Sequence, residues 1–142
     1  MGEEIVRFID ANIFLESLLR NPRWEEAEAF LGKISRGTIR GITSDYVVYS
    51  VLLRMASVKK DADMMKDFVI SLGNMAGLTV VRSTAPILLT TISLMSANGL
   101  DFDDSLQVAF MASMGVREIV SFDKHFSKVN DIRRVEPRDI VG

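Results

Sequence analysis

The sequence predicts an α/β fold: a three-layer α/β/α sandwich with a central, mainly parallel sheet of about four or five strands. Short, β-rich apolar runs alternate with longer segments in which apolar residues recur at helical spacing, and this alternation is typical of a parallel sheet covered on both faces. The chain has 142 residues, about the length of one domain. Its composition is 48% hydrophobic and 25% charged, as in ordinary globular proteins. We therefore expect a single domain over residues 1–142.

The N-terminal elements follow from apolar runs and capping residues. Residues 4–10 form a β-rich apolar run that ends in an acid, which predicts a buried strand. Residues 12–20 carry leucine and isoleucine at helical spacing. Asn21 and Pro22 then predict the start of a second helix, because asparagine caps helices and proline suits their first position. A short strand is expected around Ile39, between two glycines.

The remaining elements are delimited by helix-capping side chains and by glycines, which end helices in the left-handed conformation. They are, in order, a helix from Thr43 or Ser44 to Met55, a helix from Asp61 or Asp63 to Gly73, a strand over residues 78–81, a helix over residues 84–98, a helix from Asp101 to Met114 closed by Gly115, a strand over residues 118–123 and a strand over residues 132–135.

The composition also excludes several kinds of site. The absence of cysteine excludes a disulfide scaffold, a zinc ribbon and a thiol nucleophile, and a single histidine excludes a three-histidine zinc site within one chain. A net charge of −2 means that a nucleic acid would have to meet a local basic patch. The acidic N-terminus is unlike a signal peptide, and the most apolar stretch, residues 85–97, is shorter than the roughly 20 residues that span a bilayer. A cytoplasmic protein without membrane contact is expected.

Acidic residues follow two of the predicted strands, at Asp10 and Asp123, and Asp103 and Asp104 begin a predicted helix. Ligands of parallel sheets bind beyond the carboxyl ends of the strands. Carboxylates gathered there repel one another unless a cation neutralises them, and Mg²⁺ binds carboxylates while leaving room for phosphate oxygens. The pattern therefore favours a divalent-metal site suited to phosphodiester hydrolysis, although each acid alone is more often a capping or turn residue.

Three segments around these acids carry a family resemblance. Residues 8–14, Phe-Ile-Asp-Ala-Asn-Ile-Phe, form a hydrophobic-hydrophobic-Asp-x-Asn element. Residues 104–126 combine an Asp-Ser-Leu helix start, Gly115 and the strand end Ser121-Phe122-Asp123-Lys124-His125-Phe126. Residues 135–137, Val-Glu-Pro, close the pattern. Together these segments resemble the PIN-domain family, metal-dependent ribonucleases that include the VapC-type toxins.

The resemblance implies a PIN-like fold and a Mg²⁺- or Mn²⁺-dependent endoribonuclease similar to the toxin of a toxin–antitoxin pair. By resemblance, Asp10, Asp104 and Asp123 would be the catalytic residues and hold the metal ion, with Asn12 orienting Asp10 and Ser121 supporting the site. The implied partners are an RNA substrate, a small antitoxin protein and a second copy of the chain in a homodimer.

One position departs from the family pattern. The family typically places a glutamate six residues beyond a serine or threonine; Ser44 matches that start, but Ser50 stands at the position of the glutamate. Asp103 is then a possible additional carboxylate beside Asp104. The alternative function is a degenerate, non-catalytic PIN domain that binds RNA or a protein partner. A phosphatase or phosphotransferase of another α/β family ranks last, because Asn12 replaces the second acid of a haloacid-dehalogenase-type motif.

Two further features have more than one interpretation. His125 follows Asp123 closely, and a solvent-facing position is favoured over a role as general acid or base. Basic residues in the N-terminal third either form an RNA-facing stripe or belong to a mixed charged face, which the interleaved glutamates favour. These basic residues are Arg20, Arg23, Lys33, Arg36 and Arg40.

Overall fold

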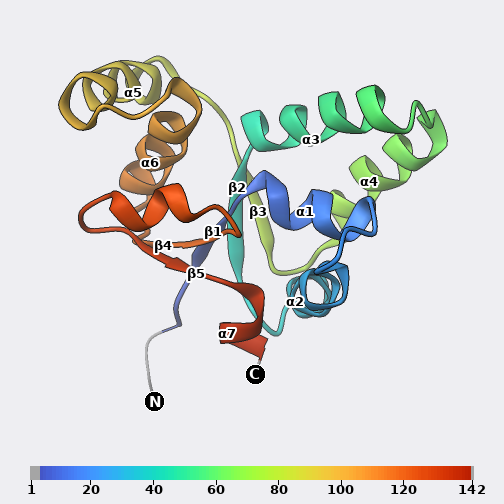
Figure 1. The fold of residues 1–142 in the computed structure, drawn as a ribbon. Coiled ribbons are helices and arrows are strands. Elements are labelled where there is room, and N and C mark those ends of the chain that lie inside the picture. Colours follow the sequence, from blue (N-terminus) through green and yellow to red (C-terminus); the bar gives the residue numbers. More distant parts are fainter. Residues whose placement is uncertain (1–3, 142) are drawn as a thin grey trace.

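A sheet of five parallel strands forms the centre of the computed structural model, which describes residues 4–141 (Figure 1). The strands are β1 (Arg7–Ile9), β2 (Gly41–Ser44), β3 (Leu78–Val81), β4 (Glu118–Val120) and β5 (Arg133–Val135), in the spatial order β3-β2-β1-β4-β5. Every pair of neighbouring strands is parallel. The predicted parallel sheet is therefore confirmed.

Helices cover both faces of this sheet. They are α1 (Ala11–Leu18), α2 (Trp24–Arg36), α3 (Asp45–Val58), α4 (Ala62–Asn74), α5 (Ala85–Asn98), α6 (Phe102–Met114) and the short α7 (Pro137–Val141), with a 3₁₀ turn, η1, at Lys124–Lys128. Figure 1 shows α5 and α6 on one side of the strands and α1 to α4 on the other. This arrangement confirms the predicted three-layer sandwich.

The core is built on the two central strands. Phe8 and Ile9 of β1 are both fully buried, and so are Ile119 and Val120 of β4. Because successive side chains of a strand point to opposite faces, burial of both members of each pair means that helices cover both faces of the sheet centre. The Phe8 ring packs against Phe110 of α6, with the ring centroids 6.4 Å apart.

Two predicted boundaries in the N-terminal half differ from the structure. The second helix begins at Trp24 rather than at Pro22, because residues 21–24 form a turn in which the Trp24 amide donates to the Asn21 carbonyl at 2.9 Å. The second strand begins at Gly41 rather than around Ile39. The Ile39 amide still donates to the Lys33 carbonyl at 3.3 Å, so this stretch closes α2 instead of joining the sheet.

Local capping signals place the elements that lead to the carboxyl ends of the central strands. The Ser44 hydroxyl accepts the Val47 amide at 3.1 Å and so caps α3 as predicted. Gly115 ends α6 with a φ of +67°, a left-handed conformation that glycine adopts without a steric penalty. The chain then enters β4 directly. Across residues 4–141, no helix combines the length and apolar character that crossing a bilayer requires.

Candidate functional site

The candidate site lies where the strand order of the sheet reverses. From β1 the chain proceeds outward to β2 and β3, and it then crosses through α5 and α6 to β4 on the other side of β1. Crevices at such reversals, beyond the carboxyl ends of the strands, are the usual ligand sites of α/β sheets. Asp10 follows β1 and Ser121 follows β4, and the Asp10 amide donates to the Val120 carbonyl at 3.1 Å.

Asp10 is a buried carboxylate, with only 6% of the residue exposed. It caps α1, because its Oδ1 accepts the Ala11 amide at 2.8 Å. Its Oδ2 accepts the Ser121 hydroxyl at 2.6 Å and the Asn12 side-chain amide at 3.1 Å. Each oxygen of an ionised carboxylate has about two acceptor positions, so Oδ1 keeps capacity for a further ligand.

Asn12 and Ser121 join the ends of the two central strands. The Asn12 Nδ2 donates to Ser121 Oγ at 3.1 Å as well as to Asp10, and its Oδ1 accepts the Phe122 amide at 3.2 Å. The Ser121 Oγ accepts the Asp123 amide at 2.9 Å. These bonds fix the backbone that carries Asp123 relative to the carboxylate of Asp10.

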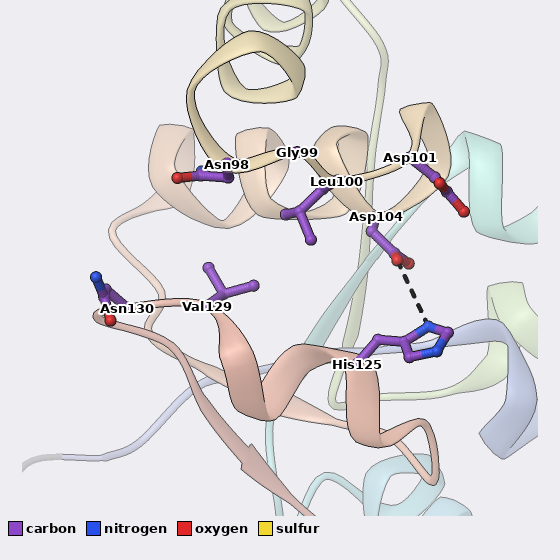
Figure 2. Close-up of a pocket in the computed structure, with 8 residues that line it drawn as sticks. All are labelled: Asn98, Gly99, Leu100, Asp101, Asp104, His125, Val129 and Asn130. Carbon is purple, nitrogen blue, oxygen red and sulfur yellow. Dashed lines mark ion pairs between the residues drawn. The ribbon is translucent and has the colours of Figure 1, made fainter.

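Asp104 and Asp123 approach the same crevice from α6 and from the loop after β4. His125 lies between them: its Nδ1 is 3.3 Å from Asp123 Oδ1 and 3.9 Å from Asp104 Oδ2. Figure 2 shows the pair with Asp104. The Asp104 side chain is 15% exposed, whereas that of His125 is 67% exposed. His125 therefore faces solvent and also contacts both acids, a bridging position that its place in the sequence does not reveal.

The electrostatics of the crevice indicate an accumulation of negative charge. The pKa of Asp10 is raised to about 6, mainly by burial and in smaller part by the charges of Asp123 and Asp104, against the opposing hydrogen bonds from Ser121 and Ala11. The pKa of Asp104 is also raised, first by burial and then by the charge of Asp123. A bound cation would reduce the free-energy cost of ionising Asp10 and Asp104.

The residues of the crevice suit a hard divalent cation by their chemistry. Carboxylate oxygens are the protein ligands that Mg²⁺ accepts, and burial together with neighbouring acids raises the pKa of Asp10 and Asp104, a shift that a bound cation would oppose. The acids are nevertheless not set at coordination distances: among residues 4–141, no three Asp, Glu, His or Cys side chains form a ready-made metal site. Bringing the side chains together around an ion requires them to move.

Comparison with known proteins gives the family. The model of the PIN domain family matches residues 7–132, which is most of the chain. The chain belongs to the PIN-domain family. A search of curated proteins gave no match.

Solved structures show that the fold is shared with VapC toxins. The Mycobacterium tuberculosis toxin VapC20, described as cleaving the sarcin–ricin loop, is 16% identical with a TM-score of 0.71, over 90% of this chain and 98% of that one. VapBC2 from Rickettsia felis, bound to a promoter DNA fragment, is 14% identical with a TM-score of 0.70, over 93% and 98%. A Klebsiella pneumoniae toxin–antitoxin complex is 14% identical with a TM-score of 0.68, over 92% and 97%.

Ser50, which stands where the family resemblance leads us to expect a glutamate, lies close to Tyr46. Ser50 is half-buried on α3, and Tyr46, one turn earlier, is close to both Ser50 and Asp103. Burial raises the pKa of the Tyr46 hydroxyl, and a hydrogen bond with the Asp103 side chain raises it further. Asp103 is exposed and adjoins this tyrosine, whereas Asp104 adjoins His125 and Asp123.

An arginine–glutamate network behind the site was missed by the sequence reasoning. Arg134 Nη1 donates to the Ser121 carbonyl at 3.0 Å and to Glu136 Oε2 at 2.9 Å, and Arg23 donates to Glu136 Oε1 at 2.7 Å. Hydrogen bonds from Arg23 and Arg134 lower the pKa of Glu136 to about 2. The Arg23 guanidinium also lies over the Phe122 ring, 4.3 Å from its centroid. The network thus supports the loop that carries Asp123.

Three of the five N-terminal basic residues, Arg20, Arg23 and Arg40, pair with acids, as a mixed charged face predicts. Arg20 lies 3.6 Å from Glu28, and Arg40 lies 3.5 Å from Glu4, in both cases measured between guanidinium nitrogen and carboxylate oxygen. Arg23 contacts Glu26 at 2.7 Å in addition to its place in the network. These pairs favour a mixed charged face over an RNA-facing stripe.

Proposed function

We propose that this PIN protein is a Mg²⁺- or Mn²⁺-dependent endoribonuclease that acts as the toxin of a toxin–antitoxin pair. The observation that carries the proposal is that Asp10, Asp104 and Asp123 lie at the reversal point of the sheet, near enough for the charges of Asp104 and Asp123 to add to burial in raising the pKa of Asp10 to about 6. Membership of the PIN family and a fold shared with VapC toxins support the same activity.

Each side chain of the site has a proposed task. Asp10, Asp104 and Asp123 would hold the ion. Bound there, the ion would lower the pKa of a water molecule and shield the negative charge that develops on the scissile phosphate. Asn12 and Ser121 donate hydrogen bonds to Asp10 Oδ2 and so hold the carboxylate in one orientation. Its Oδ1 accepts the Ala11 amide at the start of α1. His125 lies beside Asp104 and Asp123, at the edge of the proposed ion site.

The proposed partners are an antitoxin and a second copy of the chain. Two of the similar structures are toxin–antitoxin complexes, which supports an antitoxin partner here. A hollow of about 350 Å³ between α3 and α4 is mainly apolar and would accept an antitoxin side chain; it is lined by Leu52, Met65, Lys66, Val69 and Ile70.

Leu89 and Ile92 on α5 are more than half exposed and supply an apolar face for a homodimer. Light scattering on the protein alone and with the product of the adjacent gene tests both contacts.

A second candidate function rests on Ser50. A serine at the family's glutamate position removes one carboxylate from the crevice, and Tyr46, which is close to Ser50, also contacts Asp103. With fewer acidic ligands the ion would bind weakly, and the domain would then bind RNA or a protein partner without cleaving it.

A single cleavage experiment separates the two candidates. Fluorescently labelled single-stranded RNA is incubated with the wild type, Asp10→Asn, Ser50→Glu and the exposed control Asp67→Asn, in Mg²⁺, in Mn²⁺ and in EDTA. The nuclease proposal expects metal-dependent cleavage by the wild type and the control, and none by Asp10→Asn. Cleavage by Ser50→Glu alone would identify a degenerate site that one carboxylate restores. No cleavage by any of the proteins would favour the non-catalytic module.

A further inference from the structure

A cavity of about 320 Å³ opens beside the acids and is not used by the chemistry proposed above. It lies between the loop from α5 to α6 and the segment around η1, and Asp104 and His125 form one end of it (Figure 2). Leu100 and Val129 point toward each other across its middle, and Asn98 and Asn130 lie at the other end. Its volume is at the small end of the range for ligand sites, which suits one small planar group rather than a duplex.

The lining of this cavity selects against anions. Asp101 and Asp104 both line it, and no lysine or arginine is among the residues of the described chain that do so. A phosphate or carboxylate would therefore be repelled. Leu100 and Val129 are half-buried aliphatic side chains that offer opposed apolar surfaces, while the amides of Asn98 and Asn130 offer hydrogen bonds at the edge. Apolar faces with polar edges match an unstacked nucleobase.

We infer that this cavity binds one unpaired nucleobase of the RNA substrate, next to the phosphate at the acidic crevice, and that it prefers adenine or cytosine, which carry an amino group where guanine and uracil carry a carbonyl. The placement next to the phosphate rests on the proposed ribonuclease function, because Asp104 lines both the cavity and the crevice. Sequence-selective recognition of RNA depends on such splayed bases, whose edges are read by hydrogen bonds.

Asp101 provides the preference among bases. It stands at the N-cap position of α6, yet its side chain makes no capping hydrogen bond, and the carboxylate has no salt-bridge partner among the side chains that the structure describes. An ionised carboxylate only accepts hydrogen bonds. It therefore suits the amino groups of adenine and cytosine, whereas uracil presents a carbonyl oxygen at the corresponding position. A single well-placed contact of this kind gives roughly tenfold discrimination.

The first test measures binding without metal and without cleavage. Protein labelled with ¹³C at leucine and valine methyl groups is titrated with adenosine, cytidine, uridine and N-acetylarginine amide, and Leu89 on exposed α5 serves as the internal control. Adenosine and cytidine should shift the methyl resonances of Leu100 and Val129 at about tenfold lower concentration than uridine, and should leave Leu89 unchanged. Asp101→Asn keeps a good N-cap residue and should bring the three nucleosides toward equal affinity. Equal shifts by all nucleosides, or shifts by the arginine amide alone, would overturn the inference.

The second test uses cleavage of uridine-rich oligoribonucleotides that carry adenosine, cytidine or uridine at one internal position. The wild type and Asp67→Asn should cut beside adenosine or cytidine with about tenfold higher kcat/KM than beside uridine, and Asp101→Asn should bring this ratio toward one. An equal loss on all three substrates would mean that Asp101 acts on the neighbouring Asp104, which contradicts base recognition. Cleavage without preference would refute the inference and leave the nuclease intact. Methyl shifts without cleavage of any RNA would refute the nuclease and leave a nucleoside site.

Discussion

Replacing Asp10 with asparagine should make the metal-free protein more stable at neutral pH. Asp10 is buried beside two other acids, and its pKa is raised from 3.8 to about 6, so keeping it ionised at pH 7.5 opposes folding. Each pKa unit corresponds to about 1.4 kcal/mol, so a shift of about two units costs about 3 kcal/mol. Asparagine removes that cost and still accepts the Ala11 amide as an N-cap.

The gain is reduced by two hydrogen bonds. Asp10 Oδ2 accepts the Asn12 side-chain amide, and an amide nitrogen at that position would lose this bond, at about 1 kcal/mol. The Ser121 hydroxyl already accepts the Asn12 and Asp123 amides, so it cannot accept from the new amide and also loses its bond to Oδ2, at about 1 kcal/mol. The expected net increase in the free energy of unfolding is therefore about 1 kcal/mol at pH 7.5.

The pH dependence has a definite sign. A carboxyl whose pKa is raised by folding binds more protons in the native state, so its cost is absent below about pH 4 and is fully present above about pH 6. Urea unfolding in EDTA should give Asp10→Asn a higher free energy of unfolding than the wild type at pH 7.5, and this difference should disappear at pH 4. A variant that is less stable than the wild type at pH 7.5, or an equal difference at both pH values, would refute this account of the crevice.

Three further predictions concern the site and its support. Mg²⁺ should raise the melting temperature of the wild type, EDTA should reverse the increase, and Asp10→Asn should show no response in differential scanning fluorimetry. Arg134→Ala should cost about 2 kcal/mol in urea unfolding, since it leaves the Ser121 carbonyl without its donor and removes one of the guanidinium groups that pair with buried Glu136, whereas exposed Arg133→Ala should cost little. Ser105→Ala should raise the melting temperature by about 3 °C, because the Ser105 hydroxyl is buried and has no hydrogen-bond partner within residues 4–141; unchanged or lower stability would contradict this.

Elements with local signals were predictable from the sequence. The strand at residues 78–81 agrees with β3, and Thr84 and Gly115 delimit helices where expected, because capping uses only neighbouring residues. The start of α2 was not predictable in this way. Asn21 and Pro22 carry the signal of a helix start, but the turn that they form places the first helical residue at Trp24.

Some features of the candidate site were likewise predictable from the sequence, and others were not. That Asp10 and Asp123 lie at the same edge of the sheet follows from a general rule for parallel strands, which needs only the order of the elements. The pairing of Arg23 with Glu136 joins residues 113 positions apart, and no periodicity in a single sequence indicates it. Likewise, the placement of His125 between Asp104 and Asp123 depends on how α6 packs beside the loop after β4, which the sequence pattern leaves open.

Binding of Mn²⁺ tests most directly the claim that three aspartates form one divalent-metal site. Electron paramagnetic resonance measures the free ion in titrations of the wild type, Asp10→Asn, Asp104→Asn, Asp123→Asn and the exposed control Asp67→Asn. The wild type and the control should bind Mn²⁺ with the same affinity, and each of the three site variants should weaken it at least about tenfold, as expected when a ligand is removed from a shared ion. Affinity that is unchanged in all three site variants would show that these aspartates do not hold the metal.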